Sequence, residues 1–342
     1  MRNVRWLATI AVLVAFALGA AACSDVQQDP EPAPGGGETG GETGGASVAQ
    51  CGDETIVIAV NPWVGAEANA NVVKVLMENE MGCTVELQEV NENAQFPGMA
   101  AGDIDATLEV WPSGHAADRE EYIENDGGVV DGGELGITGN IGWFTPRYVV
   151  EEYPQYATWE GFQDDADVFS TAETGDKGRF LGADTTYSIF DEQIIASLGL
   201  DLEVVYSGSE AASLSALDNA VANQEPIVMY WWTPQWANAK YDLVEVELPE
   251  YTEECADIAL NDPEAIGYSC DYADDVLYKA FSAELESKDP AAFEFLSNFS
   301  WTADDQNEVA LAIQEGTDGE EAAQAWIDAN PDVWQAWLPA AS

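Results

Sequence analysis

Hydrophobic and polar positions after residue 50 alternate between the spacings of strands and of helices. Residues 55–60 (TIVIAV) form a short β-rich run, and apolar residues then recur at helical spacing over 72–77. Gly82 is typical of a helix end, and period-two alternation over 83–87 and 104–110 predicts two further strands. Strands and helices that succeed one another in this way predict an α/β fold.

The middle of the chain contains a second cycle of the same kind. We expect strands over 139–144, 204–206 and 227–231, with helices over 192–198 and 214–223. From about Asp274 the apolar residues Val276, Leu277, Ala280 and Phe281 recur at helical spacing, which predicts a mostly helical end of the chain. The pattern therefore favours two α/β lobes.

The N-terminus has the composition of an export signal. Arg2 and Arg5 precede an apolar run over 6–18, which is short for a membrane span, and small residues lead from it directly to Cys23. This arrangement resembles a bacterial lipoprotein processing site. We therefore expect a signal peptide over 1–22 and acylation of Cys23, with plain secretory cleavage and a free Cys23 as the alternative.

Residues 23–50 are rich in Pro, Gly, Glu and Thr, and they include the run GGGETGGETGG over 35–45. Such a segment cannot bury apolar surface. We expect it to be a flexible linker between a lipid anchor and the folded part of the chain.

Four cysteines remain when Cys23 is set aside. An even number in an exported chain predicts two disulfides in an oxidising compartment. Spacing favours Cys51 with Cys83, at the starts of neighbouring strands, and Cys255 with Cys270 across a loop. Zinc is the alternative, but no paired Cys-x-x-Cys is present, so we expect no metal.

Charge and the absence of catalytic motifs exclude several functions. The 64 Asp and Glu against 10 Lys and Arg give a formal charge of −54, which argues against nucleic acid or anionic lipid as a partner and is typical of proteins in salty surroundings. His115 is the only histidine, and the hydrolase elbow and both nucleotide-binding glycine loops are missing. We expect no enzyme activity and no cofactor.

Three tryptophans stand at predicted strand ends, each with a proline one or two residues away: Trp63, Trp111 and Trp232. In open α/β sheets, ligands bind beyond the carboxyl ends of strands. A quaternary ammonium has no N–H donor, so aromatic faces are what attract it. The three residues therefore predict an aromatic cage, with packing in the core or at the rim as the alternative for any one of them.

Four segments resemble the glycine betaine, proline betaine and choline-binding proteins of ABC importers: 60–62 (VNP), 111–115 (WPSGH), 142–148 (GWFTPRY) and 232–236 (WTPQW). The resemblance implies a two-lobed periplasmic-binding-protein fold (Venus-flytrap, type II) with a central cleft. Lobe 1 would contain 51–145 and 262–342, and lobe 2 would contain 146–261.

The resemblance also implies roles for single residues. Trp111 and Trp232 would be cage walls from opposite lobes, and Trp63 matches a cage tryptophan of the choline-binding branch. His115 would face the ligand carboxylate. The loop with Thr185, Thr186 and Tyr187 aligns with one whose backbone N–H groups hold that carboxylate.

Two positions depart from the family pattern. The betaine branch has a tryptophan at about the position of Asp184, so Tyr187 or Trp143 would supply the missing wall. The choline branch has an aspartate where this chain has Gly65, which favours a betaine, although Glu67 as a substitute keeps choline open.

The sequence thus predicts an exported lipoprotein on the outer face of the cell membrane that captures a compatible solute for osmoprotection. The expected protein is a monomer that delivers glycine betaine or a related solute to an ABC permease. The alternatives are a choline- or carnitine-binding member of the family and, in another class, a carbohydrate-binding lipoprotein, because tryptophan also stacks on sugar rings.

Overall fold

One mixed β-sheet runs through the computed structural model, which describes residues 47–125, 127–163, 165–255 and 269–341. Within these residues the sheet order is β2-β1-β3-β9-β4-β7-β5-β6, and β8 pairs with β4. The strands are β1 (Thr55–Val60), β2 (Thr84–Glu89), β3 (Ala106–Val110), β4 (Val129–Pro146), β5 (Gly178–Gly182), β6 (Leu202–Tyr206), β7 (Val228–Thr233), β8 (Leu243–Glu245) and β9 (Asp274–Ser282).

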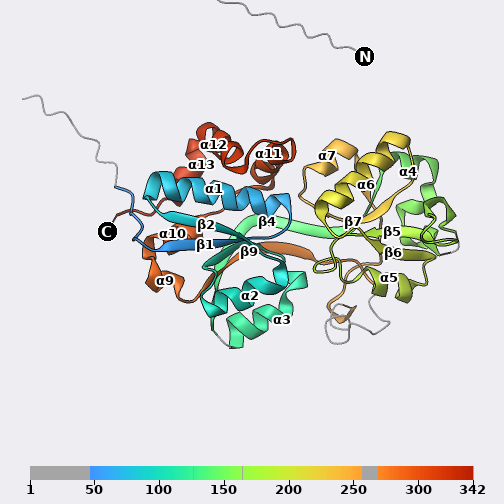
Figure 1. Cartoon of the computed structure of the whole chain (residues 1–342). Helices are drawn as coiled ribbons and strands as arrows, with labels where there is room; N and C mark the ends of the chain where they lie inside the picture. The colour runs from blue at the N-terminus through green and yellow to red at the C-terminus, as the bar shows by residue number, and fades with distance from the viewer. Residues whose placement is uncertain (1–46, 126, 164, 256–268, 342) are drawn as a thin grey trace, which may run out of the picture. The chain divides into compact units, whose positions relative to one another are not determined.

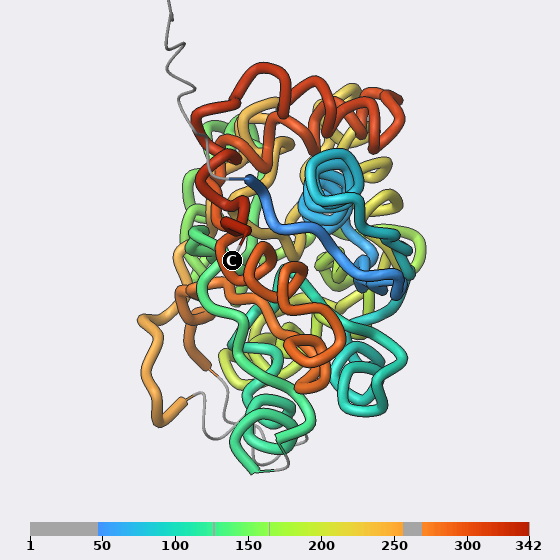
Figure 2. The backbone as a smooth tube through the Cα atoms, turned by 90° about the vertical axis from the view of Figure 1, so that its left-hand side faces the viewer, coloured from blue at the N-terminus to red at the C-terminus, as the bar shows by residue number. Residues whose placement is uncertain are grey.

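Helices lie on both faces of this sheet (Figure 1). They are α1 (Val64–Met81), α2 (Glu92–Ala101), α3 (Ala116–Asp118), α4 (Arg147–Glu152), α5 (Asp191–Leu198), α6 (Glu210–Asn223), α7 (Ala237–Tyr241), α9 (Leu285–Lys288), α10 (Pro290–Asn298), α11 (Ala303–Gln314), α12 (Gly319–Ala329) and α13 (Pro331–Trp334). Figure 2 shows the C-terminal helices, in red, beside the blue helix α1, which contacts α11 and α12. Both ends of the described chain therefore build the same side of the molecule.

The long strand β4 links two groups of elements. Residues 129–140 of β4 pair with β9, whereas 140–144 pair with β7 and 144–146 with β8. We call β1–β3 with α1, α2 and α9–α13 the first half, and β5–β8 with α4–α7 the second half. The predicted lobe boundary at 145/146 falls at the end of β4 and stays a prediction, and the one at 261/262 lies outside the described residues.

Local signals set several of the element ends. Gly82 ends α1 in the left-handed conformation, at φ 68°, where its N–H donates to the Met77 carbonyl. Ser209 begins α6 because its side chain accepts a hydrogen bond from the Ala212 N–H, and Asn91 begins α2 in the same way through Ala94. The expected strands at 55–60, 104–110, 204–206 and 227–231 are present within two residues of their predicted ends.

The prediction of a helix from about Asp274 was wrong for its first part. Residues Asp274–Ser282 form β9, which lies antiparallel between β3 and β4. From Leu277 onward β9 is buried on both faces of the sheet, so its apolar residues run on almost without interruption and mimic helical spacing. Helix α2 and strand β5 were not predicted at all.

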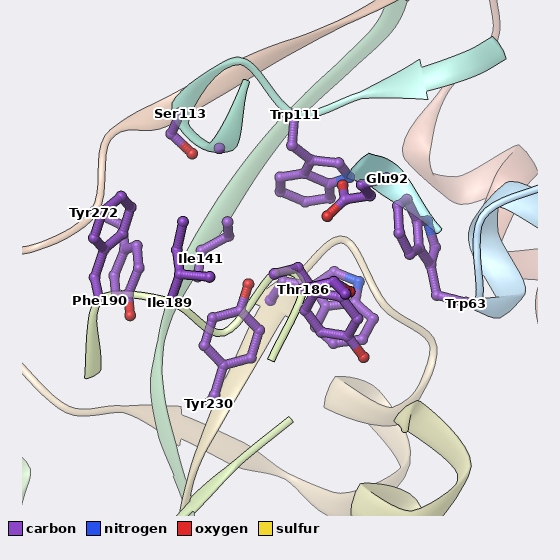
Figure 3. Close-up of a pocket in the computed structure, with 13 residues that line it drawn as sticks. Trp63, Glu92, Trp111, Ser113, Ile141, Thr186, Ile189, Phe190, Tyr230 and Tyr272 are labelled. Carbon is purple, nitrogen blue, oxygen red and sulfur yellow. The ribbon is translucent and has the colours of Figure 1, made fainter. Parts of the chain in front are cut away.

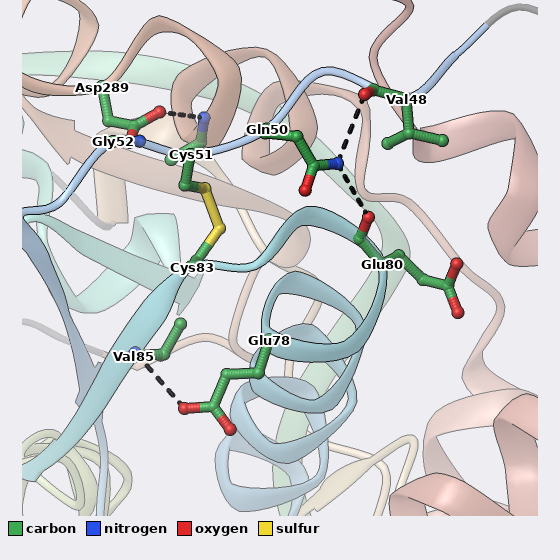
Figure 4. The surroundings of a disulfide bond; sticks show 10 residues. Val48, Gln50, Cys51, Gly52, Glu78, Glu80, Cys83, Val85 and Asp289 are labelled. Carbon is green, nitrogen blue, oxygen red and sulfur yellow. Dashed lines mark hydrogen bonds between the residues drawn. A yellow bond between two sulfur atoms is a disulfide. The ribbon is translucent and has the colours of Figure 1, made fainter.

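Both predicted disulfides are confirmed. Cys51–Cys83 joins the segment before β1 to the start of β2, with a Cα–Cα distance of 5.0 Å (Figure 4). Cys255 and Cys270 form the second disulfide, with a Cα–Cα distance of 6.4 Å. The segments 1–22 and Cys23 lie outside the described residues, as does most of the predicted linker. Among the described residues, no helix has both the length and the apolarity needed to cross a membrane.

Candidate functional site

A pocket of about 570 Å³, including its open mouth, lies at the carboxyl ends of β1, β3 and β7 (Figure 3). Trp63 directly precedes α1, Trp111 directly follows β3, and Trp232 is near the end of β7. These three tryptophans line the pocket together with Glu92, Ser113, Gly114, Ile141, Thr186, Tyr187, Ile189, Phe190, Tyr230 and Tyr272. The pocket therefore has an aromatic wall that comes from both halves.

Tyr187 links the aromatic rings of the two halves. Its ring centroid lies 6.0 Å from that of Trp63 at an interplanar angle of 77°, and 6.2 Å from that of Trp232 at 82°. Edge-to-face contacts of this kind are favourable. Tyr230 belongs to the same group, because its ring lies 5.9 Å from Tyr187 and 6.3 Å from Trp232.

A glycine on β4 makes room for the Trp111 ring. A Cβ atom at Gly139 would lie 2.3 Å from the Trp111 indole, far inside van der Waals contact. The bare backbone of Gly139 therefore lets this indole approach the strand closely.

One buried carboxylate in the first half holds two of the tryptophans. Oε1 of Glu109 accepts hydrogen bonds from the indole N–H of Trp63, at 2.8 Å, and of Trp111, at 3.0 Å. Its Oε2 accepts from the side-chain amides of Asn69, at 2.6 Å, and Gln306, at 2.8 Å. Burial raises the pKa of Glu109, and the four donors oppose that rise.

A second buried carboxylate, at the start of α5, holds aromatic side chains in the second half. Asp191 accepts hydrogen bonds from the Trp143 indole N–H at 2.8 Å, the Tyr272 hydroxyl at 2.8 Å and the Ser188 hydroxyl at 2.6 Å. Trp143 itself is fully buried, with its ring 4.4 Å from Phe180. The structure therefore places Trp143 behind the pocket and not in its wall.

His115 also lies behind the pocket wall. Its Nε2 is 3.2 Å from Glu92 Oε1 and its Nδ1 is 2.8 Å from Asp118 Oδ2. Burial alone lowers the pKa of His115, but the Asp118 and Glu92 carboxylates raise it to about 9. The imidazolium thus has both nitrogens engaged, and Glu92 stands between it and the pocket, so the structure does not show His115 facing a ligand carboxylate.

The loop after β5 uses its backbone donors internally. The Thr186 N–H donates to Asp184 Oδ1 at 2.8 Å, and the N–H groups of Tyr187 and Ser188 donate to the Asp184 carbonyl. Thr186 and Tyr187 line the pocket, whereas Thr185 is exposed and does not line it. Of the predicted site residues, the structure thus brings together Trp63, Trp111, Trp232, Thr186 and Tyr187.

Several lining residues were not predicted from the sequence. Tyr230 shares one face of β7 with Trp232, two residues away, so strand periodicity gave a usable signal. Tyr272 and Glu92 have no such signal, because only the fold brings them to this pocket. Within the described ranges, no group of three His, Cys, Asp or Glu side chains is arranged to hold a metal ion.

Comparisons with known proteins agree with this architecture. Residues 54–329 match a family model described as the substrate binding domain of ABC-type glycine betaine transport system. The glycine betaine/carnitine transport binding protein GbuC of Listeria monocytogenes is 34% identical over 131 residues, a match that spans only 38% of this chain and 38% of that protein.

Solved structures show the same fold. Lactococcal OpuAC, in a closed-liganded conformation with glycine betaine, is 22% identical with a TM-score of 0.63, over 84% of this chain and 100% of that one. The ProX protein of Borrelia burgdorferi is 23% identical with a TM-score of 0.67, over 84% and 97%. An ABC-transporter choline binding protein in complex with choline is 21% identical with a TM-score of 0.62, over 83% and 91%. The two-lobed α/β fold is confirmed.

Proposed function

Because this chain belongs to the family of substrate-binding domains of ABC-type glycine betaine transport systems, we propose that it captures a small quaternary-ammonium solute, such as glycine betaine, for an ABC importer. The family is a binding component of transporters and not an enzyme. One observation carries the proposal: Trp63, Trp111 and Trp232, which are far apart in sequence, line a single pocket.

The proposed aromatic cage matches the chemistry of such a ligand. A quaternary nitrogen carries a permanent charge but has no N–H group that could donate a hydrogen bond. Ring faces and methyl contacts therefore supply the attraction. Each ring face contributes about 0.5–2 kcal/mol when it is shielded from water. Trp63, Trp111 and Trp232 are each 7% exposed, so little of each residue is open to solvent outside the pocket.

The acidic surroundings of the pocket support a ligand with a positive group. Glu92 lines the pocket, and Glu109 and Asp191 lie directly behind its wall. Among the described residues that line the pocket there is no lysine or arginine. Glycine betaine and choline both carry a trimethylammonium that these charges attract, whereas a sugar carries no positive charge.

We further propose that the two lobes have the boundaries predicted from the sequence, and that ligand binding favours a closed arrangement of these lobes. A closed, loaded form that differs from the empty one gives a permease something to recognise. The proposed setting is the outer face of the cell membrane, where an acylated Cys23 and a linker over 23–50 would anchor a monomeric receptor.

Isothermal titration calorimetry of the mature chain tests the proposed function. Glycine betaine, proline betaine, choline and carnitine are titrated in parallel with glucose and maltose. Saturable binding of at least one quaternary ammonium, with none of the sugars, is the expected result. Binding of the sugars alone would instead identify a carbohydrate receptor.

A further inference from the structure

Glu109 lies on β3, two residues before Trp111, and is 2% exposed. It occupies the space between α1, α11 and the two indoles of the first half. Gly65 contributes to this space, because a Cβ atom there would lie 3.4 Å from Glu109 Oε2 and 3.3 Å from Gln306 Nε2. The carboxylate is thus enclosed on the side away from the pocket.

Each oxygen of Glu109 accepts two N–H groups, from Trp63 and Trp111 on Oε1 and from Asn69 and Gln306 on Oε2. A protonated carboxyl would direct its own O–H at one of these donors. The contacts therefore fit the ionised form. The ion pairs of the described residues do not include Glu109, so its charge is balanced only by neutral donors.

The network extends away from the pocket. Asn69 Oδ1 accepts hydrogen bonds from the Trp301 indole N–H, at 2.9 Å, and from Gln306, at 3.2 Å. Asn69 and Gln306 are therefore oriented by further contacts, and they present their N–H groups to Glu109. This fixes the carboxylate, which in turn fixes the N–H edges of both indoles and directs the rest of each ring toward the pocket.

We propose that Glu109 is the positioning residue of the ligand cage, and that its negative charge behind Trp63 and Trp111 makes the cage prefer a cation to a neutral group of the same shape. An indole that donates its N–H to a carboxylate gains electron density on its ring, which strengthens its attraction for a cation. Where water is largely excluded, the carboxylate also attracts a cationic ligand directly, because the Coulomb interaction is screened less. This inference rests on the proposed function.

The test compares each cation with its carbon analogue, which has the same shape and lacks the ammonium charge. The pairs are choline with 3,3-dimethylbutan-1-ol and glycine betaine with 3,3-dimethylbutanoate. Dissociation constants are measured by tryptophan fluorescence for the wild type, for Glu109→Gln and for Glu86→Gln. Glu86 is an exposed carboxylate on β2, so its variant controls for the change in overall charge.

Glu109→Gln is expected to raise the dissociation constant of the ammonium ligand by about tenfold or more. The dissociation constant of the carbon analogue is expected to change by less than about threefold. Glu86→Gln is expected to change neither. Equal losses for cation and analogue, or no loss for the cation, would overturn the inference and leave the proposed function intact. A wild type that binds no quaternary ammonium would instead refute the proposed function.

A second measurement does not need a ligand. In ¹H–¹⁵N spectra of protein with ¹⁵N-labelled tryptophan, the indole resonances of Trp63 and Trp111 are assigned with the variants Trp63→Phe and Trp111→Phe. Both are expected downfield of an exposed indole and are expected to move upfield together in Glu109→Gln, because one oxygen accepts both. Movement of neither resonance would show that Glu109 does not hold the rings.

Discussion

The backbone N–H of Val64 donates a 2.8 Å hydrogen bond to Oε2 of Glu210, a residue 146 positions later in the chain. Val64 is the first residue of α1 in the first half, and Glu210 is the first residue of α6 in the second half. Oε1 of Glu210 accepts a further hydrogen bond from Gln235, at 2.6 Å. The beginnings of two helices, one from each half, are thus joined by one carboxyl group.

This contact predicts a pH dependence of ligand affinity. Burial raises the pKa of Glu210 to about 7. If the contact belongs to the closed, loaded form, that form binds a proton that a solvated Glu210 would release. Affinity is then highest below the ordinary carboxyl pKa of 4.5, falls as pH rises from there to 7, and levels off above 7. The expected loss is up to about tenfold between pH 6 and pH 8, and calorimetry at these two values measures it.

Glu210→Gln is expected to flatten this pH profile, because the amide has no proton to lose. The exposed residue Glu225, replaced by glutamine, is the matched control and should leave the profile as it is in the wild type. Identical profiles of affinity against pH for Glu210→Gln and the wild type would show that Glu210 does not cause the pH dependence.

Trp232→Ala is expected to reduce affinity for a quaternary ammonium by about tenfold to a hundredfold, since it removes one ring face and its methyl contacts. The measurement is a calorimetric titration with the ligand that the wild type binds best. Trp159→Ala removes a half-buried tryptophan that does not line the pocket, and it should leave affinity within about twofold. Retained affinity in Trp232→Ala would be incompatible with the cage.

His115 predicts a pH dependence of stability with a defined sign. Its pKa in the folded chain, about 9, lies above its ordinary value of 6.5, so the stabilisation is fully present below pH 6.5 and is lost as pH rises through 9. At pH 6 the effect is roughly 3 kcal/mol. Urea unfolding of the wild type and of His115→Gln should therefore show a large difference in unfolding free energy at pH 6 and a small one at pH 10.

The same variant tests the role of His115 at the ligand. Because Glu92 lies between the imidazolium and the pocket, His115→Gln is expected to change the affinities for glycine betaine and choline by similar factors. A selective loss for glycine betaine would show that His115 meets the ligand carboxylate after all, as the family resemblance implies.

The two disulfides are expected to stabilise the fold mainly by restricting the unfolded chain. They close loops with sequence separations of 32 and 15 residues, for which the chain-entropy model gives about 3–4 kcal/mol each. The variant Cys51→Ser/Cys83→Ser should therefore lower the free energy of urea unfolding by that amount. An unchanged value would mean that the unfolded chain is already restricted at this end.

Local sequence signals predicted most of the strands of the fold and several of its helices. Short β-rich runs, a glycine after α1 and polar residues before α6 act within a few residues, so the sequence alone could place them. The failure at β9 has the opposite origin. Its neighbours in the sheet, β3 and β4, are distant in sequence, so the chain around β9 does not show that it is an interior strand.

The sequence by itself determined which aromatic residues stand at strand ends, Trp63, Trp111 and Trp232, and the family resemblance added Tyr187 as a further wall of the proposed cage. Only the tertiary structure decided what stands behind those rings. Glu109, Asp191 and Glu92 are acids among 64, and nothing in their local sequence separates them from solvated ones. They differ because the fold buries them against indole, phenol and imidazole groups from other elements, and burial against distant donors leaves no local pattern in the chain.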